Sequence, residues 1–177
     1  MADVRGLTEI RWHARAGQGA KTAAQALALA LLESGRAVQA FPEYGPERRG
    51  APLRAYTRLS DRPIRRHDGV TDPDLVVVLE QSLLTEVDVA EGMRENGIVL
   101  LNGEVAPAQL AGLDVRVVPA TRIAPGFENV VMLGAVAAAL GEPPVETVQD
   151  AAVSLLGRKR GADEIRAAVA EGHSCLA

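Results

Sequence analysis

The sequence predicts an α/β fold built on a mixed but mostly parallel sheet, with a hairpin-like insertion at one edge. Apolar runs of strand length, LVVVL at 75–79 and IVLL at 98–101, are typical of strands buried in a parallel sheet. Helix-like segments alternate with these strands, as crossover connections require. The stretch 36–70 departs from this alternation by placing strand-like segments close together, which indicates the insertion.

The first half of the chain is expected to open with a strand, because residues 7–14 (LTEIRWHA) alternate apolar and polar side chains. An Ala- and Leu-rich helix is expected over 20–34, where Gly35 ends it. Two more strands and their connections complete this half: strands at 37–41 and 53–60, a Pro- and Gly-rich loop at 42–52, and a turn at 60–63.

In the second half, a turn at 72–74 leads into an apolar strand that runs to Glu80. An amphipathic helix is expected over 82–95, since Asn96 and Gly97 provide a stop. The other predicted elements are strands at 97–102 and 114–121, and helices at 127–140, 150–156 and 163–171. With no internal repeat, the whole chain, 1–177, is expected to form a single domain with its own core.

Composition and charge limit the possible classes of protein. The chain is 47% hydrophobic but only 3% aromatic, so the core is expected to consist of Ala, Val, Leu and Ile. A net charge of −4 argues against general affinity for nucleic acid, and no apolar stretch reaches the roughly 18 residues of a membrane span. The first residues also lack the pattern of a signal peptide.

Cys175 is the only cysteine, so no disulfide within the chain, no iron–sulfur cluster and no Cys-rich zinc site is expected from this sequence. This usage suits a reducing compartment, and we expect a cytoplasmic protein. The three histidines, at 13, 67 and 173, show no metal-ligand spacing. His13 stands beside a glycine-rich loop, where it either touches a bound molecule or serves as a satisfied structural group.

Charged residues are distributed unevenly along the chain. Residues 43–68 hold seven arginines and four acidic residues, whereas 72–114 hold nine acidic residues and one arginine. Two solvated faces of opposite charge are the simpler interpretation, and orientation on a partner is the alternative.

The loop within HARAGQGAKTAA (13–24) is the first candidate site. A strand, a glycine-rich turn and a helix in succession are typical of anion capture, because a helix amino terminus has unpaired backbone N–H groups and partial positive charge. Gly17, Gln18, Gly19 and Thr22 are the candidate residues. The stricter nucleotide fingerprints are absent, since Thr22 stands where a third glycine would be and Ala20 precedes Lys21. A tight packing turn and a seat for another subunit's backbone are the alternatives.

Two further stretches are unusual. The loop FPEYGPERRGAP (41–52) presents Tyr44, Glu47, Arg48 and Arg49 within a few residues, and guanidinium pairs suit carboxylate or phosphate recognition. In the alternative reading, Glu47 pairs with a neighbouring arginine and the loop only turns. The third stretch, 119–135, places Asn129 near a helix start, where we expect it to cap the helix.

Together the three stretches resemble the gamma subunit, or gamma domain, of the 2-oxoacid:ferredoxin oxidoreductases, of which pyruvate:ferredoxin oxidoreductase is the best-known member. The resemblance spans residues 10–140. The first stretch departs from the family pattern where Ala14 and Ala16 replace glycines, and each Cβ is expected to narrow the approach to the loop. The matching residues are His13, Arg15, Gly17, Gln18, Gly19, Thr22 and Ala23, then Pro42, Tyr44, Gly45, Glu47, Arg48, Arg49, Gly50 and Ala51, and finally Ile123, Ala124, Asn129, Leu133, Gly134 and Ala135.

The resemblance implies a Rossmann-like, three-layer fold and a place in a complex with alpha, beta and delta subunits. Such complexes oxidatively decarboxylate a 2-oxoacid to an acyl-CoA and carbon dioxide. They use thiamine diphosphate with Mg²⁺ and [4Fe–4S] clusters, held by the partner subunits, and pass electrons to ferredoxin or a similar acceptor. The gamma chain is expected to bind no cofactor alone and to border the coenzyme A route.

The resemblance also implies that coenzyme A or a partner subunit meets the three stretches, with no catalytic residue among them. The residues concerned are Gly17, Gln18, Gly19, Thr22, Tyr44, Glu47, Arg48, Arg49 and Asn129. The competing hypothesis is a free-standing Rossmann-type nucleotide-binding module.

Overall fold

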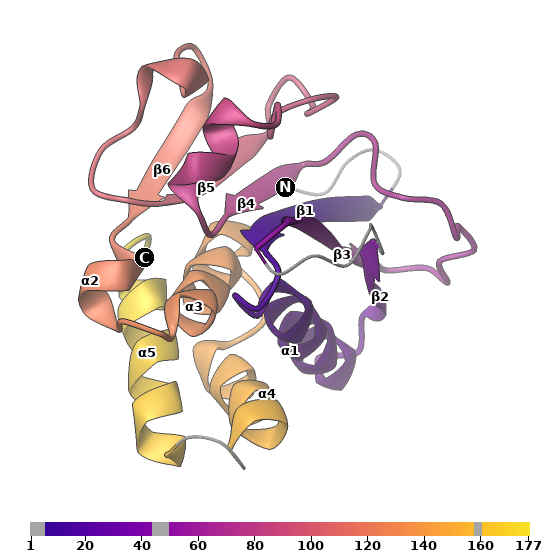
Figure 1. Ribbon diagram of the computed structural model, residues 1–177. Helices are drawn as coiled ribbons and strands as arrows, with labels where there is room; N and C mark the ends of the chain where they lie inside the picture. Colours follow the sequence, from indigo (N-terminus) through magenta and orange to yellow (C-terminus); the bar gives the residue numbers. More distant parts are fainter. Residues whose placement is uncertain (1–5, 44–49, 158–160) are drawn as a thin grey trace.

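A six-stranded sheet forms the centre of the computed structural model, which describes residues 6–43, 50–157 and 161–177 (Figure 1). The strand order is β2-β3-β1-β4-β5-β6. β1, β4, β5 and β6 run parallel, and β3 runs antiparallel to both β1 and β2. The strands are β1 (Leu7–Arg15), β2 (Ala37–Glu43), β3 (Pro52–Ser60), β4 (Leu75–Val78), β5 (Ile98–Asn102) and β6 (Asp114–Val118).

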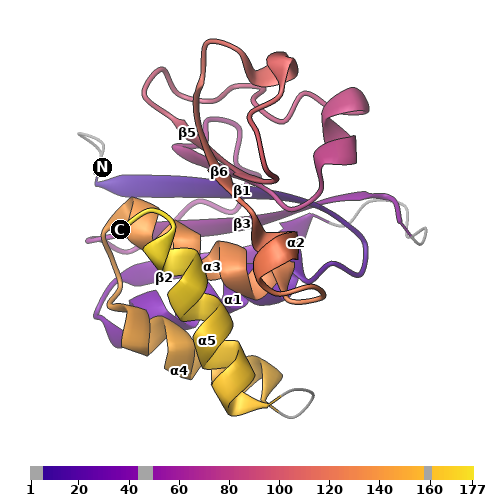
Figure 2. The ribbon, with the colours of Figure 1, turned by 90° about the vertical axis from the view of Figure 1, so that its left-hand side faces the viewer.

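Among the described residues, five α-helices cover one face of the sheet, and two 3-10 helices with long loops cover the other (Figure 2). This arrangement confirms the predicted α/β class with a mostly parallel sheet, and the β2–β3 pair is the hairpin-like insertion. The helices are α1 (Ala20–Glu33), α2 (Ala120–Ile123), α3 (Glu128–Leu140), α4 (Val145–Leu156) and α5 (Ala162–Ser174), and the 3-10 helices are η1 (Gln81–Thr85) and η2 (Ala108–Leu110).

The predicted helix over 82–95 is wrong, because only η1 and a series of turns occupy this segment. Arg11 Nη2 on β1 donates to the carbonyl oxygens of Val89 (2.9 Å) and Glu91 (2.6 Å), which a continuous helix would have used internally. The Asp88 carboxylate accepts from Ala90 N, a local bond that competes with helix formation. Contacts with the rest of the protein therefore override the amphipathic pattern.

The apolar core divides between the two faces of the sheet. Under the α-helices, Trp12 and its neighbours on β1 pack against Ala- and Leu-rich helix faces, as the composition predicted. On the other face, Val76, Val78, Val99 and Leu101 pack beneath the 3-10 helices. Alternating residues of β4 and β5 thus contribute to both clusters, which explains why these strands are apolar throughout.

α3 and α5 pack closely through two glycines. A Cβ atom on Gly134 would overlap the Val169 carbonyl oxygen, and one on Gly172 would overlap the Val131 carbonyl oxygen. The absence of both side chains therefore lets the two backbones touch, and the pairing of these residues makes the helices antiparallel.

Replacing Gly134 by Ala is expected to lower the free energy of unfolding by about 1–3 kcal/mol, through overpacking against α5. In an ordinary helix the same change stabilises by about 1 kcal/mol, so the sign of the effect is diagnostic. Denaturant titration of the purified chain measures it. Gly69→Ala is the control, since Gly69 is exposed and its new Cβ would make only ordinary contacts, the nearest at 3.8 Å with Tyr56. A Gly134→Ala chain as stable as the parent would contradict the close packing.

Candidate functional site

The glycine loop, residues 16–19, connects the carboxyl end of β1 to the start of α1. Gly17 has φ 99° and Gly19 has φ 80°, a region that side chains with a Cβ rarely adopt. A Cβ on Gly19 would lie 2.5 Å from Asn129 Nδ2, whereas one on Gly17 would meet no atom within 4 Å. Gly19 is therefore required for packing, and exposed Gly17 leaves the backbone open to an approaching molecule.

Asn129 does not cap α3, so the predicted capping role is wrong. Phe127 occupies the cap position, and Asn129 instead donates from Nδ2 to the Gly19 carbonyl oxygen at 3.3 Å. That same oxygen accepts the first helical bond of α1, from Ala23 N at 3.0 Å. The amino ends of α1 and α3 consequently adjoin, and neither has a side-chain cap.

Two adjoining helix amino ends concentrate partial positive charge and unpaired backbone N–H groups at one point. Thr22 lies half-buried in the first turn of α1. Of the two alanines that replace family glycines, Ala14 is fully buried in the core, so its Cβ does not narrow the approach to the loop. The arrangement is chemically suited to an anion such as phosphate.

Gln18 fixes the glycine loop through both ends of its amide. Its Oε1 accepts from Arg15 N at 2.7 Å, and its Nε2 donates to Glu80 Oε2 at 3.0 Å. Glu80 follows β4, and its other oxygen accepts from Ser82 N at the start of η1. Partial burial acts to raise the pKa of Glu80, but the hydrogen bonds from Ser82 and Gln18 lower it on balance.

Arg15, the last residue of β1, adds a second connection between the carboxyl ends of β1 and β4. Its guanidinium donates to Ser82 Oγ at 2.7 Å, pairs with Glu86, and donates to the Gly50 carbonyl at 3.0 Å. Ala16 N also donates to the Ala51 carbonyl at 3.0 Å. Two residues of the second candidate stretch, Gly50 and Ala51, are thereby attached to the chain at the glycine loop.

The predicted site residues Tyr44, Glu47, Arg48 and Arg49 lie outside the described residues. The structure brings together four other predicted site residues, Gly17, Gln18, Gly19 and Asn129. Thr22 lies close by on α1. Sequence reasoning missed Glu80 as a partner of this group, because an acidic residue at the end of an apolar strand carries no signal of its own.

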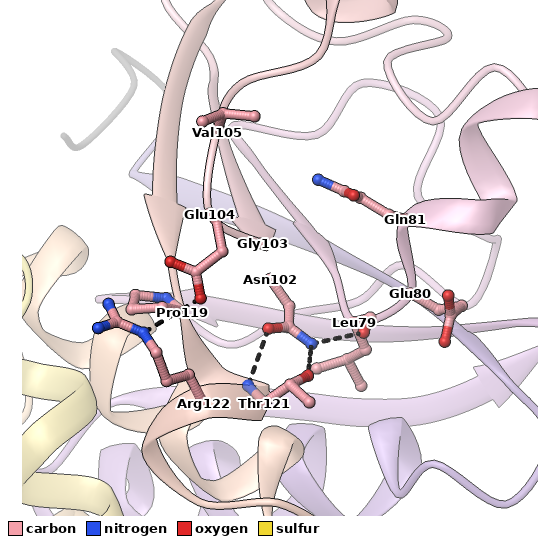
Figure 3. A pocket seen from close by; sticks show the side chains of 10 residues that line it. All are labelled: Leu79, Glu80, Gln81, Asn102, Gly103, Glu104, Val105, Pro119, Thr121 and Arg122. Atoms are coloured by element: carbon pink, nitrogen blue, oxygen red, sulfur yellow. Dashed lines mark hydrogen bonds and ion pairs between the residues drawn. The ribbon is translucent and has the colours of Figure 1, made fainter.

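A cavity of about 510 Å³ opens beside Glu80, at the carboxyl ends of β4, β5 and β6 (Figure 3). Asn102 lies at its centre and is fully engaged: Nδ2 donates to the Leu79 carbonyl and to Thr121 Oγ1, and Oδ1 accepts from Thr121 N. Glu104 and Arg122 form an exposed ion pair at the rim. Asn102 thus holds three chain segments in place, and both of its N–H donors are used within the protein.

The basic and acidic stretches face one another on the second face of the sheet. Arg54 of the basic stretch lies 4.0 Å from Glu91 of the acidic stretch. At this contact the charges of the two stretches partly offset each other.

His13 is a buried structural group beneath these segments. Its Nε2 accepts from Arg11 Nε at 3.1 Å, so the ring is neutral. Burial and the charges of Arg11 and Arg54 lower the pKa of His13 to about 3. Within residues 6–43, 50–157 and 161–177, no group of three or more His, Cys, Asp or Glu side chains could hold a metal ion. None of the helices in these ranges is both long and apolar enough to cross a membrane.

Comparison with known proteins identifies the family. The model of the pyruvate ferredoxin/flavodoxin oxidoreductase family matches residues 9–175. The chain belongs to this family. A Thermococcus litoralis protein named pyruvate/ketoisovalerate oxidoreductases common subunit gamma is 42% identical over 173 residues, covering 92% of this chain and 94% of the relative. A Thermotoga maritima protein named pyruvate synthase subunit PorC is 45% identical, covering 85% and 83%.

Solved structures agree with this membership. The crystal structure of the pyruvate oxidoreductase subunit PORC from Thermotoga maritima superposes with a TM-score of 0.78 and 38% identity, covering 96% of both chains. A Magnetococcus marinus 2-oxoglutarate:ferredoxin oxidoreductase superposes with a TM-score of 0.81 but 15% identity, over 31% of that chain, and shows the shared fold alone. This gamma-type chain is thus a subunit of a 2-oxoacid oxidoreductase, and the resemblance seen in its motifs is confirmed against a free-standing nucleotide-binding module.

Replacing Gly19 by Ala is expected to destabilise this chain more than replacing Gly17 by Ala. Both changes force a residue with a Cβ atom to adopt a positive φ, which lowers the free energy of unfolding by about 1–3 kcal/mol. Only Gly19→Ala also displaces the Asn129 side chain. In an Asn129→Ala background the excess should disappear. Denaturant titrations of Gly17→Ala and Gly19→Ala, each with and without Asn129→Ala, measure this double-mutant cycle. Equal losses for the two glycines in both backgrounds would refute the packing role of Gly19.

The low pKa of His13 predicts that stability decreases in acid. The folded pKa of about 3 lies below the ordinary value of 6.5, so between these values the unfolded chain binds the extra proton. Stability should therefore fall as pH falls through this window, by at most about 1.4 kcal/mol per pH unit. His13→Gln should flatten this dependence in denaturant titrations, whereas the exposed control His67→Gln should not. An unchanged slope for His13→Gln would contradict the assignment.

Proposed function

We propose that this chain is the gamma subunit of a cytoplasmic complex with alpha, beta and delta partners. The complex converts a 2-oxoacid and coenzyme A to an acyl-CoA and carbon dioxide, and the two electrons released pass to ferredoxin or a similar acceptor. The names of its relatives, which are gamma and PorC subunits of pyruvate and ketoisovalerate oxidoreductases, support this assignment. The chain is expected to be inactive alone.

The partner subunits supply thiamine diphosphate with Mg²⁺, and the [4Fe–4S] clusters. The residues of this chain do not fit a cluster, which needs several thiolates, because Cys175 is its only cysteine. Thiamine diphosphate provides the carbanion chemistry when bound in the partners. The contribution of the gamma chain is therefore binding and orientation.

The adjoining amino ends of α1 and α3 carry the proposal that this orientation concerns coenzyme A. Coenzyme A bears a diphosphate and a 3′-phosphate, and the Gly19–Asn129 contact brings two uncapped helix starts together beside open Gly17. The site comprises Gly17, Gln18, Gly19, Thr22 and Asn129. We expect the site to be completed by Tyr44, Glu47, Arg48 and Arg49. The residues that follow them in the sequence, Gly50 and Ala51, accept hydrogen bonds from Arg15 and Ala16.

Replacing Arg48 and Arg49 together by Ala is expected to raise the KM for coenzyme A about tenfold or more in the assembled complex. Hydrogen bonds from guanidinium groups to phosphate are worth about 1.5–3 kcal/mol, and about 1.4 kcal/mol corresponds to a factor of ten. Steady-state kinetics with varied coenzyme A measure the effect.

Arg62 and Arg65 provide the matched control, because both are exposed and lie in the loop after β3, away from the glycine loop. Their double replacement by Ala should leave the KM for coenzyme A unchanged. If both pairs behave alike, the site proposed for coenzyme A is wrong.

A further inference from the structure

The conformation of the glycine loop depends on a carboxylate from another strand. Gly17 and Gly19 both have positive φ, and glycine can adopt many backbone conformations, so the two glycines by themselves do not fix the backbone around Gln18. Gln18 N donates to the Arg15 carbonyl at 3.1 Å, and the Gln18 amide bonds Arg15 N and Glu80. The Gln18 side chain is thus the element that selects one loop conformation, and Glu80 holds that side chain.

We infer that Glu80 is a positioning residue, which acts through Gln18 to hold the glycine loop in the conformation that receives the phosphates of coenzyme A. This inference rests on the proposed function and extends it to a residue outside all three recognised stretches. It also accounts for the adjacency of Glu80 to the loop without requiring that a carboxylate touch a phosphate.

Glu80 is itself rigidly placed. The preceding residue, Leu79, donates from N to the His13 carbonyl at 2.9 Å, which continues the parallel pairing of β1 and β4. Glu80 Oε1 accepts from Ser82 N, and Oε2 accepts from Gln18. Both carboxylate oxygens are therefore engaged in fixing the chain, and the lowered pKa keeps the group ionised at neutral pH.

The position of Glu80 in the sheet explains why such a support is needed there. α1 follows β1 on one face of the sheet, whereas η1 follows β4 on the opposite face (Figure 1). The two connections therefore diverge where β1 and β4 end, and ligands of open α/β sheets bind in the crevice at such a point. The Gln18–Glu80 bond joins the two connections at this point, and the Arg15–Ser82 bond joins the ends of the two strands again.

The test uses the assembled complex with Glu80→Gln. A neutral amide cannot accept hydrogen bonds from both Gln18 and Ser82 through two oxygens, so the loop loses one anchor. The KM for coenzyme A should rise about tenfold, as expected for a loop displaced by a fraction of an ångström, while the KM for the 2-oxoacid stays within about twofold. Glu104→Gln is the matched control, since its carboxylate lies at the rim of the neighbouring cavity and forms an exposed ion pair with Arg122.

A compensating exchange separates positioning from a general loss of structure. In Glu80→Gln combined with Gln18→Glu, the donor and acceptor are swapped, and each hydrogen bond can reform. Hydrogen–deuterium exchange of the peptide spanning residues 13–19 should increase in Glu80→Gln and return to the parent level in the double variant. A double variant that exchanges as fast as Glu80→Gln would overturn the inference.

Asn129→Asp distinguishes failure of this inference from failure of the proposed function. It places a negative charge between the two helix amino ends, so it should raise the KM for coenzyme A if the phosphates bind there. If Asn129→Asp raises the KM and Glu80→Gln does not, the positioning role is refuted and the proposed site stands. If neither variant changes the KM for coenzyme A, both are refuted.

Discussion

The buried ion pair between Glu9 on β1 and Arg58 on β3 is the interaction on which the second face of the sheet depends. Both side chains are fully buried, 2.7 Å apart, and Arg66 and Arg94 approach the other Glu9 oxygen. An unpaired charge at such depth would cost several kcal/mol, so the segments that deliver its partners must stay in place. Arg11 adds bonds to the carbonyls of the same covering segments. These bonds fix the segments around Val70 and around residues 89–94 against β1 and β3.

Much of the fold could be predicted because its signals are local. The apolar runs of β4 and β5, the alternation in β1 and the glycine that ends α1 each depend on neighbouring residues. The glycine loop and Asn129 were found through motifs rather than through geometry, and the structure brings them into contact. The β2–β3 hairpin was likewise apparent from two strand-like segments with no helix between them.

The errors arise where distant residues decide a local structure. The segment 82–95 has a helical pattern, but its carbonyl groups bind Arg11, almost 80 residues earlier. Asn129 is of a residue type that is favoured at helix caps, but its amide fills the space beside Gly19, 110 positions away. The polar side chains that alternate along β1, Glu9, Arg11 and His13, are all buried, and the partners of Glu9 and Arg11 lie on distant segments. No local pattern encodes such partnerships.

The glycine-mediated contact between α3 and α5 gives the protein a built-in reporter. Gly172 meets Val131 in the first turn of α3, and Cys175 directly follows the last residue of α5. The only thiol of the chain is exposed and therefore accessible to a fluorescent or spin label. Because the two backbones are in direct contact, such a label would sense displacement of the amino end of α3, where Asn129 lies, without any engineered substitution.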